Sequence, residues 1–178
     1  MLNKEGRAAA AADTKTLTPS IIRSTQGASS ESKLYDTVPP SLPLKKPKTT
    51  RVYVENGDTL SIARKLSTSS LTRKVGVLNM ASEKQPGGGW LRGALAQEES
   101  LCLSSTLAAS LKPSYYPLPS LGAIWSPNVV VFKDAIANDC RILEPQERFV
   151  ISVVSVAGLR RPPLSSDQLD YSKCGPKP

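Results

Sequence analysis

The stretch that decides the fold is residues 75–111, which read VGVLNMASEKQPGGGWLRGALAQEESLCLSSTLAASL. Residues 75–81 are almost continuously apolar, which predicts a strand covered on both faces of a sheet. Residues 94–111 predict a helix that ends at Lys112-Pro113, because the residue before a proline avoids helical backbone. Between the two stand Gly87, Gly88 and Gly89, which expose backbone amides and allow positive φ. Such a loop predicts an anion-binding site, with a flexible connector as the alternative.

Flanking segments supply the other expected elements. Alternating or continuous apolar residues predict strands over 51–56, 128–132 and 148–156. Asp58 or Thr59 is placed to cap a short helix that ends at residue 66. The resulting order alternates strands and helices, which predicts an α/β layered domain with a largely parallel or mixed sheet.

Both ends of the chain are predicted to be tails. Residues 1–50 are rich in Ala, Ser, Thr, Pro and Lys, and we expect a disordered basic tail there. Within it, PPSLPLKKPK (39–48) is either a solvated linker or a patch that binds polyanions. We expect residues 51–163 to form the folded part and residues 164–178 to be a polar tail.

Composition excludes several classes of function. The 178 residues contain no histidine, so there is no Ser-His-Asp triad and no His-ligated zinc. The three cysteines form no CxxC pair, which argues against a metal site and a disulfide scaffold. No run approaches ~20 apolar residues, so we expect no membrane span and a location in the cytoplasm or nucleus. The net charge of +8 suits a polyanionic partner, but few aromatics and no groove-reading motif argue against direct DNA or RNA binding.

Two adjacent carboxylates are the strongest candidates for chemistry. Glu98 and Glu99 lie near the start of the predicted helix 94–111, beside its apolar side and with no neighbouring Lys or Arg on that side. If they are buried, their pKa values rise, which suits a general acid in glycosidic bond cleavage. The alternative is a solvated acidic first turn that complements the helix dipole.

The glycines and carboxylates together resemble a known family. Gly87, Gly88 and Gly89 are followed by seven residues and then by Gln97, Glu98 and Glu99. This GGG-to-QEE spacing resembles the signature of the poly(ADP-ribose) glycohydrolases, in the microbial type found in fungi. Three further segments are similar to the same family: VYVENGDTLSIARKL (52–66), SLGAIWSPNVVVFKD (120–134) and RFVISVVSVAGLRRP (148–162).

The resemblance implies a macrodomain-like α/β fold, with helices on both faces of its sheet, that binds ADP-ribose units of poly(ADP-ribose) or of an ADP-ribosylated protein. Glu99 would be the catalytic acid that protonates the departing ribose oxygen and then helps to activate water. Glu98 would hold a ribose hydroxyl, and the loop 87–89 would hold the terminal ribose and adjoining phosphate. Asn79 and Gln97 would complete the substrate-binding set. No metal or redox cofactor is implied.

The resemblance also implies a longer domain. Members of the family continue beyond the strand equivalent to 149–156, with a second glycine-rich loop that has no counterpart in this sequence. We therefore expect residues 51–163 to be the N-terminal portion of the catalytic domain, truncated at its C-terminal side. The alternatives to an active glycohydrolase are a module that only binds ADP-ribose and an inactive fragment.

Overall fold

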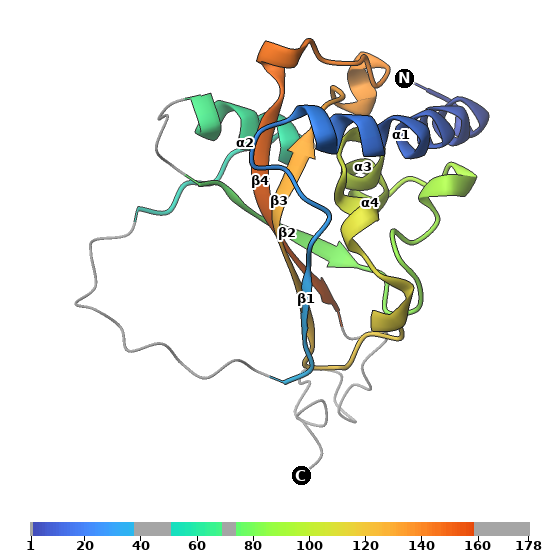
Figure 1. Cartoon of the computed structure of the whole chain (residues 1–178), viewed down its shortest axis with the longest axis vertical. Helices are drawn as coiled ribbons and strands as arrows, with labels where there is room; N and C mark the ends of the chain where they lie inside the picture. Colours follow the sequence, from blue (N-terminus) through green and yellow to red (C-terminus); the bar gives the residue numbers. More distant parts are fainter. Residues whose placement is uncertain (1, 38–50, 69–73, 159–178) are drawn as a thin grey trace, which may run out of the picture.

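The computed structural model describes residues 2–37, 51–68 and 74–158 (Figure 1). Its centre is a four-stranded sheet in the order β1-β3-β4-β2. The strands are β1 (Lys33–Tyr35), β2 (Gly76–Ala81), β3 (Ala123–Val131) and β4 (Phe149–Ala157). β2 and β4 run parallel, whereas β3 is antiparallel to both β1 and β4. The predicted mixed α/β fold is confirmed.

Helices pack mainly on one face of the sheet, and one helix also covers one end of the other face. The α-helices are α1 (Lys4–Ser24), α2 (Thr59–Thr68), α3 (Gln97–Ser104) and α4 (Leu107–Ser110). Short 3₁₀ segments are η1 (Trp90–Arg92), η2 (Pro113–Tyr115), η3 (Ile136–Asn138) and η4 (Pro145–Glu147). The predicted cap of α2 is confirmed, since the backbone amides of Leu60 and Ser61 each donate to Asp58 Oδ1 at 3.0 Å.

Alternation along β3 divides the core into two clusters. Val129 and Val131 belong to the larger cluster, which includes Leu101 of α3. Val130 points to the opposite face, where it joins Phe132 and Ile21 of α1 in a smaller cluster. α1 therefore crosses the end of the sheet and covers one end of its second face (Figure 1).

The prediction of a tail over residues 1–50 is wrong for α1 and β1. Asn3 caps α1 by accepting a hydrogen bond from the Gly6 amide at 2.8 Å, and the alanine run that follows has the highest helix propensity. Ala11 and Thr14 are fully buried, and β1 pairs with β3. The predicted linker 39–48 and the polar tail 164–178 lie outside the described residues.

Side chains tie α1 to three parts of the domain. Thr14 Oγ1 donates to Leu103 O of α3 at 2.7 Å. The ammonium of Lys133, a residue only 2% exposed, donates to Asp13 Oδ2 at 2.6 Å and to Ala10 O at 3.1 Å. Arg7 Nε donates to the carbonyl of Gly93 at 2.9 Å, directly after η1. The N-terminal helix is therefore part of the folded domain and braces the glycine loop region.

Other predicted boundaries also changed. Residues 51–56 form no strand, and Val52 and Val54 are 85% and 99% exposed. The predicted helix 94–111 begins only at Gln97 and breaks at Ser105, whose φ of −142° is extended because it bridges to Val131. β3 begins before the predicted residue 128, since a bulge between Ser126 and Val129 accommodates Pro127.

β2 is an edge strand with one open face. Val77 and Asn79 point into the core, whereas Leu78 and Met80 are 57% and 64% exposed. The prediction that this strand is covered on both faces is therefore wrong. β2 pairs with β4 along one edge, and no described strand pairs with the other edge of β2.

Candidate active site

The candidate site lies where β2 ends, the glycine loop turns and α3 begins. Gly87 and Gly88 both adopt positive φ, +67° and +55°, which L-residues with a side chain rarely adopt. Gln85 holds this turn together, because its Nε2 donates to Gly88 O at 2.6 Å and its carbonyl accepts from the Gly88 amide at 3.2 Å. The loop is therefore a hydrogen-bonded turn, and its role as an anion-binding site stays a prediction.

Glu99 lies directly against this loop. The Gly89 amide donates to Glu99 Oε1 at 2.9 Å. A Cβ atom on Gly88 would stand only 2.6 Å from the same oxygen, closer than real Cβ contacts come. Only glycine at position 88 therefore lets the carboxylate approach the loop, and Glu99 remains 9% exposed there.

Glu98 is more deeply buried, with 3% of its surface exposed. Its Oε2 accepts from the Ser82 amide at 2.8 Å, and its Oε1 accepts from Asn79 Nδ2 at 3.3 Å. Burial raises the pKa of Glu98 and outweighs these hydrogen bonds, which lower it, while the charge of Glu99 raises it further. The alternative of a solvated acidic first turn is wrong, because both carboxylates are buried.

Asn79 links Glu98 to the sheet. Its side chain is fully buried and donates to Ser155 Oγ at 3.0 Å as well as to Glu98. Its Oδ1 is buried and has no hydrogen-bond partner among the described residues. The structure therefore joins the predicted Asn79 to Glu98, and its contact with a ribose stays a prediction.

Gln97 binds the backbone of β2 through both ends of its side-chain amide. Gln97 Nε2 donates to Leu78 O at 2.6 Å, and Gln97 Oε1 accepts from the Met80 amide at 2.8 Å. These two bonds fix the first residue of α3 to the edge strand and so orient the two glutamates that follow. A contact of Gln97 with substrate likewise stays a prediction.

Sequence reasoning missed several residues of this site. Ser82 and Gln85 lie within the polar run between the strand and the glycines, which was the available signal. Nothing in the sequence marked Tyr116, whose hydroxyl is buried without a partner in the described part of the chain. Burial raises the pKa of Tyr116, and the nearby charge of Glu98 raises it further.

Comparison with protein-family models gives a match for this chain. The family described as the microbial-type PARG catalytic domain matches residues 8–134 of the chain. The chain belongs to this family. The match begins inside α1, so the family's region includes much of the segment that was expected to be a tail. A search of the curated proteins gave no match.

Solved structures of bacterial PARG share the fold. The chain is 28% identical to the poly(ADP-ribose) glycohydrolase of Thermomonospora curvata, with a TM-score of 0.69 over 88% of this chain and 65% of that one. The same enzyme bound to the inhibitor ADP-HPD matches with 26% identity and a TM-score of 0.69, over 94% and 68% of the two chains. The chain thus spans just under two thirds of the length of the first of these structures.

The described part of this PARG-family chain holds few other candidate groups. It contains no cluster of three or more His, Cys, Asp or Glu side chains that could hold a metal ion. None of its described helices combines the length and apolarity needed to cross a membrane.

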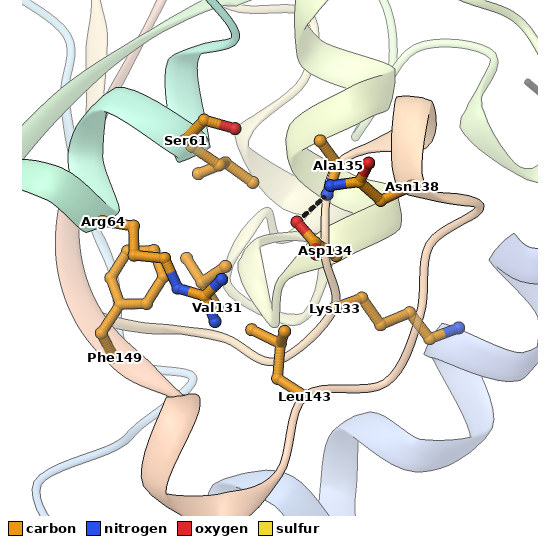
Figure 2. Close-up of a pocket in the computed structure, with 10 residues that line it drawn as sticks. Ser61, Arg64, Val131, Lys133, Asp134, Ala135, Asn138, Leu143 and Phe149 are labelled. Atoms are coloured by element: carbon orange, nitrogen blue, oxygen red, sulfur yellow. Dashed lines mark hydrogen bonds between the residues drawn. The ribbon is translucent and has the colours of Figure 1, made fainter.

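A cavity of about 220 Å³ lies at the end of the sheet opposite to the two glutamates, and Figure 2 shows the residues that line it. It is lined by the end of β3 at Val131 and the start of β4 at Phe149, whereas the glutamates lie at the carboxyl end of β2, which runs parallel to β4. Lys133 points away from it towards α1, where it binds Asp13. This cavity is thus separate from the glutamate pair.

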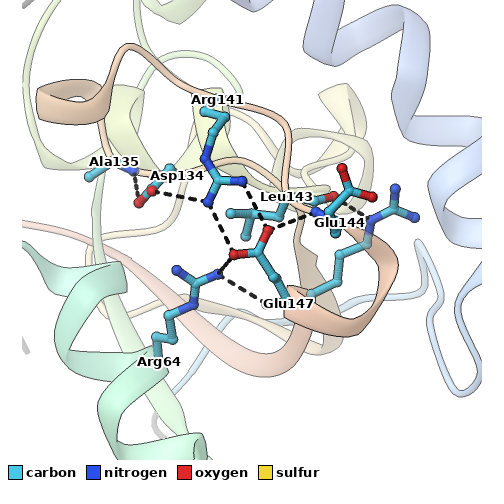
Figure 3. Close-up of polar contacts among 8 residues, drawn as sticks. Arg64, Asp134, Ala135, Arg141, Leu143, Glu144 and Glu147 are labelled. Carbon is cyan, nitrogen blue, oxygen red and sulfur yellow. Dashed lines mark hydrogen bonds and ion pairs between the residues drawn. The ribbon is translucent and has the colours of Figure 1, made fainter.

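A network of ion pairs orders the loop beside this cavity (Figure 3). Arg141 donates two hydrogen bonds to Glu147, at 3.0 and 3.1 Å, and Arg64 approaches the same carboxylate at 3.7 Å. Hydrogen bonding from Arg141, with a further bond from the Glu144 amide, lowers the pKa of Glu147 to about 2. These groups are solvent-accessible, so they position the loop more than they stabilise the fold.

Proposed function

We propose that the chain is a poly(ADP-ribose) glycohydrolase that cleaves ribose–ribose bonds and releases ADP-ribose, with Glu99 as general acid and base. The observation that carries the proposal is the contact of Glu99 with the Gly88–Gly89 turn, where a side chain on residue 88 would exclude the carboxylate. The similar enzyme from Thermomonospora curvata, which was solved with the inhibitor ADP-HPD, supports it.

The proposed reaction uses the two glutamates in different ways. Glu99, the more exposed of the two, gives a proton to the departing ribose oxygen, so that an oxocarbenium-like sugar forms. The resulting carboxylate then takes a proton from the attacking water. Glu98 holds a ribose hydroxyl, and the backbone amides of residues 87–89 hold the ribose and its phosphate. The substrate is poly(ADP-ribose) itself or the polymer on a modified protein.

The proposed location is the cytoplasm or the nucleus. Cys102 and Cys140 are free thiols in the structure, which is in keeping with a reducing compartment.

The decisive test is the Glu99→Gln variant with poly(ADP-ribose) as substrate. We expect ADP-ribose release to fall by about 10²–10⁴-fold, the range for loss of a general acid, while calorimetry still detects ADP-ribose binding. The matched control is Glu31→Gln, which makes the same change at an exposed glutamate and should release ADP-ribose at the wild-type rate. The proposal is wrong if the wild-type chain releases no ADP-ribose, or if Glu99→Gln releases it at the wild-type rate.

A module that only binds ADP-ribose is the second candidate. It is favoured by the exposure of Leu78 and Met80 beside the site, because glycosidic cleavage needs a site that excludes water. Heat of binding with ADP-ribose, together with no release from polymer, would establish this candidate instead of the enzyme.

A further inference from the structure

One charged side chain at the glycine loop has no role in the arrangement described so far. Arg92 is the last residue of η1, and two residues separate it from the last of the three glycines. Its Nη2 lies 3.9 Å from the point where a Cβ atom on Gly89 would stand, and Glu99 Oε1 lies 3.7 Å from that point. The guanidinium and the carboxylate that we propose as catalytic therefore lie on the same side of Gly89, next to the methyl group of Ala94, which stands 2.7 Å from that point.

The backbone that carries Arg92 is held firmly. Trp90 is 6% exposed, and its carbonyl accepts the Gly93 amide at 3.1 Å. The Gly93 carbonyl in turn accepts from Arg7 Nε at 2.9 Å. An exposed side chain thus stands on a braced turn, and no ion pair of Arg92 occurs within the described residues.

A cation beside the two glutamates would favour the binding of a negatively charged ligand. Glu98 and Glu99 both lie at the loop, and a diphosphate brought beside them would repel either carboxylate whenever it is ionised. A guanidinium offsets this repulsion, and its planar set of donors matches two phosphate oxygens at once. Because Arg92 is exposed, it can meet a ligand without first breaking an ion pair.

We propose that Arg92 binds a phosphate group of the ADP-ribose unit whose ribose lies against Glu99. The inference rests on the proposed function, because it takes the ligand from there. It assigns to Arg92 a binding role that is separate from the proton transfers of Glu99. The diphosphate is recognised by charge and by paired hydrogen bonds.

The test is calorimetry with ADP-ribose on the wild-type chain and on Arg92→Gln and Arg92→Lys. We expect Arg92→Gln to bind about tenfold more weakly, the effect of losing a charge-assisted hydrogen bond. Arg92→Lys keeps the charge but loses the paired geometry, so its affinity should lie between the two. Added salt should weaken the wild type more than Arg92→Gln. With polymer, KM should change more than kcat.

The matched control is Arg23→Gln, which removes the same charge from an exposed position at the far end of α1. Arg23 lies roughly 24 Å along the helix from Arg7, the residue that contacts Gly93, so this variant should bind ADP-ribose as the wild type does. Circular dichroism verifies that each variant is folded.

Two outcomes overturn the inference, and they are distinguishable. If the wild type binds ADP-ribose and a folded Arg92→Gln binds it equally well, the role of Arg92 is wrong and the proposed function stands. If the wild type neither binds ADP-ribose nor releases it from polymer, both are wrong.

Discussion

Replacing Gly88 with alanine should disable the site while leaving the fold in place. The new Cβ atom would stand 2.6 Å from Glu99 Oε1 and 3.1 Å from Glu98 Oε2. Ordinary contact begins at 3.4 Å, so the Glu99 carboxylate must retreat by about 0.8 Å and leave its bond to the Gly89 amide. A displacement of about 1 Å in a catalytic group costs about 10²-fold in rate. We therefore expect kcat for ADP-ribose release to fall by about 10²-fold.

The cost in stability should be small by comparison. Gly88 has a φ of +55°, and a side chain in this left-handed region costs about 1–2 kcal/mol. Urea unfolding followed by circular dichroism gives this free energy, and release of ADP-ribose from polymer gives kcat. Activity should therefore fall far more than the change in the free energy of unfolding would explain.

Gly27→Ala is the control that separates strain from steric exclusion. Gly27 also has positive φ, +77°, but no atom lies within 4 Å of the position of its Cβ. This variant should show a similar loss of stability with wild-type activity. If folded Gly88→Ala keeps more than about a third of the wild-type kcat, or if Gly27→Ala loses activity equally, the steric account of the loop is refuted.

Three further predictions concern other buried groups. Because the pKa of Glu98 is raised in the folded protein, ionisation of this carboxyl lowers the stability of the wild type as the pH rises. The melting temperature of Glu98→Gln should therefore increase relative to that of the wild type between acidic and neutral pH. A difference in melting temperature that stays constant with pH would contradict this. Cys102 and Cys140 are buried with raised pKa values, so peptide mapping should find neither alkylated by iodoacetamide until the chain is unfolded, whereas rapid native labelling would argue against their burial. Asp13→Asn leaves the buried ammonium of Lys133 without its anion and should lower the free energy of unfolding by about 1–2 kcal/mol, more than Lys133→Met does; the reverse order in urea unfolding would disprove the explanation.

The sequence predicted the parallel strands β2 and β4 well because their physical signal is local. Residues 75–81 and 148–156 are nearly continuous in apolar residues, and both form strands within a residue or so of the predicted bounds. The helix α1 was missed because its signal is weak: its apolar face rests on small residues such as Ala11, with few large ones such as Ile21. The features of the sequence that could have predicted α1 were the alanine run and the capping residue Asn3.

The candidate site was predicted in part for a similar reason. Glu98 and Glu99 stand close to the glycines in sequence, and the resemblance of this spacing to the family signature implied that they lie together at the site. Ser155 could not be found in this way, because it lies 76 residues from Asn79 and meets it only through the parallel register of β2 and β4. Burial of both glutamates was likewise decided by packing that is distant in sequence.

The attachment of Gln97 to β2 fixes the start of α3 to the edge of the sheet. Its amide makes the two bonds that a residue of a parallel neighbouring strand would make with Leu78 O and the Met80 amide. A strand that paired at this position would have to displace Gln97 and release the first turn of α3, and with it Glu98 and Glu99. A strand that replaced these two bonds and the present position of Glu98 and Glu99 would therefore exclude one another, so pairing at this edge would oppose ligand binding at the carboxylates and the reverse.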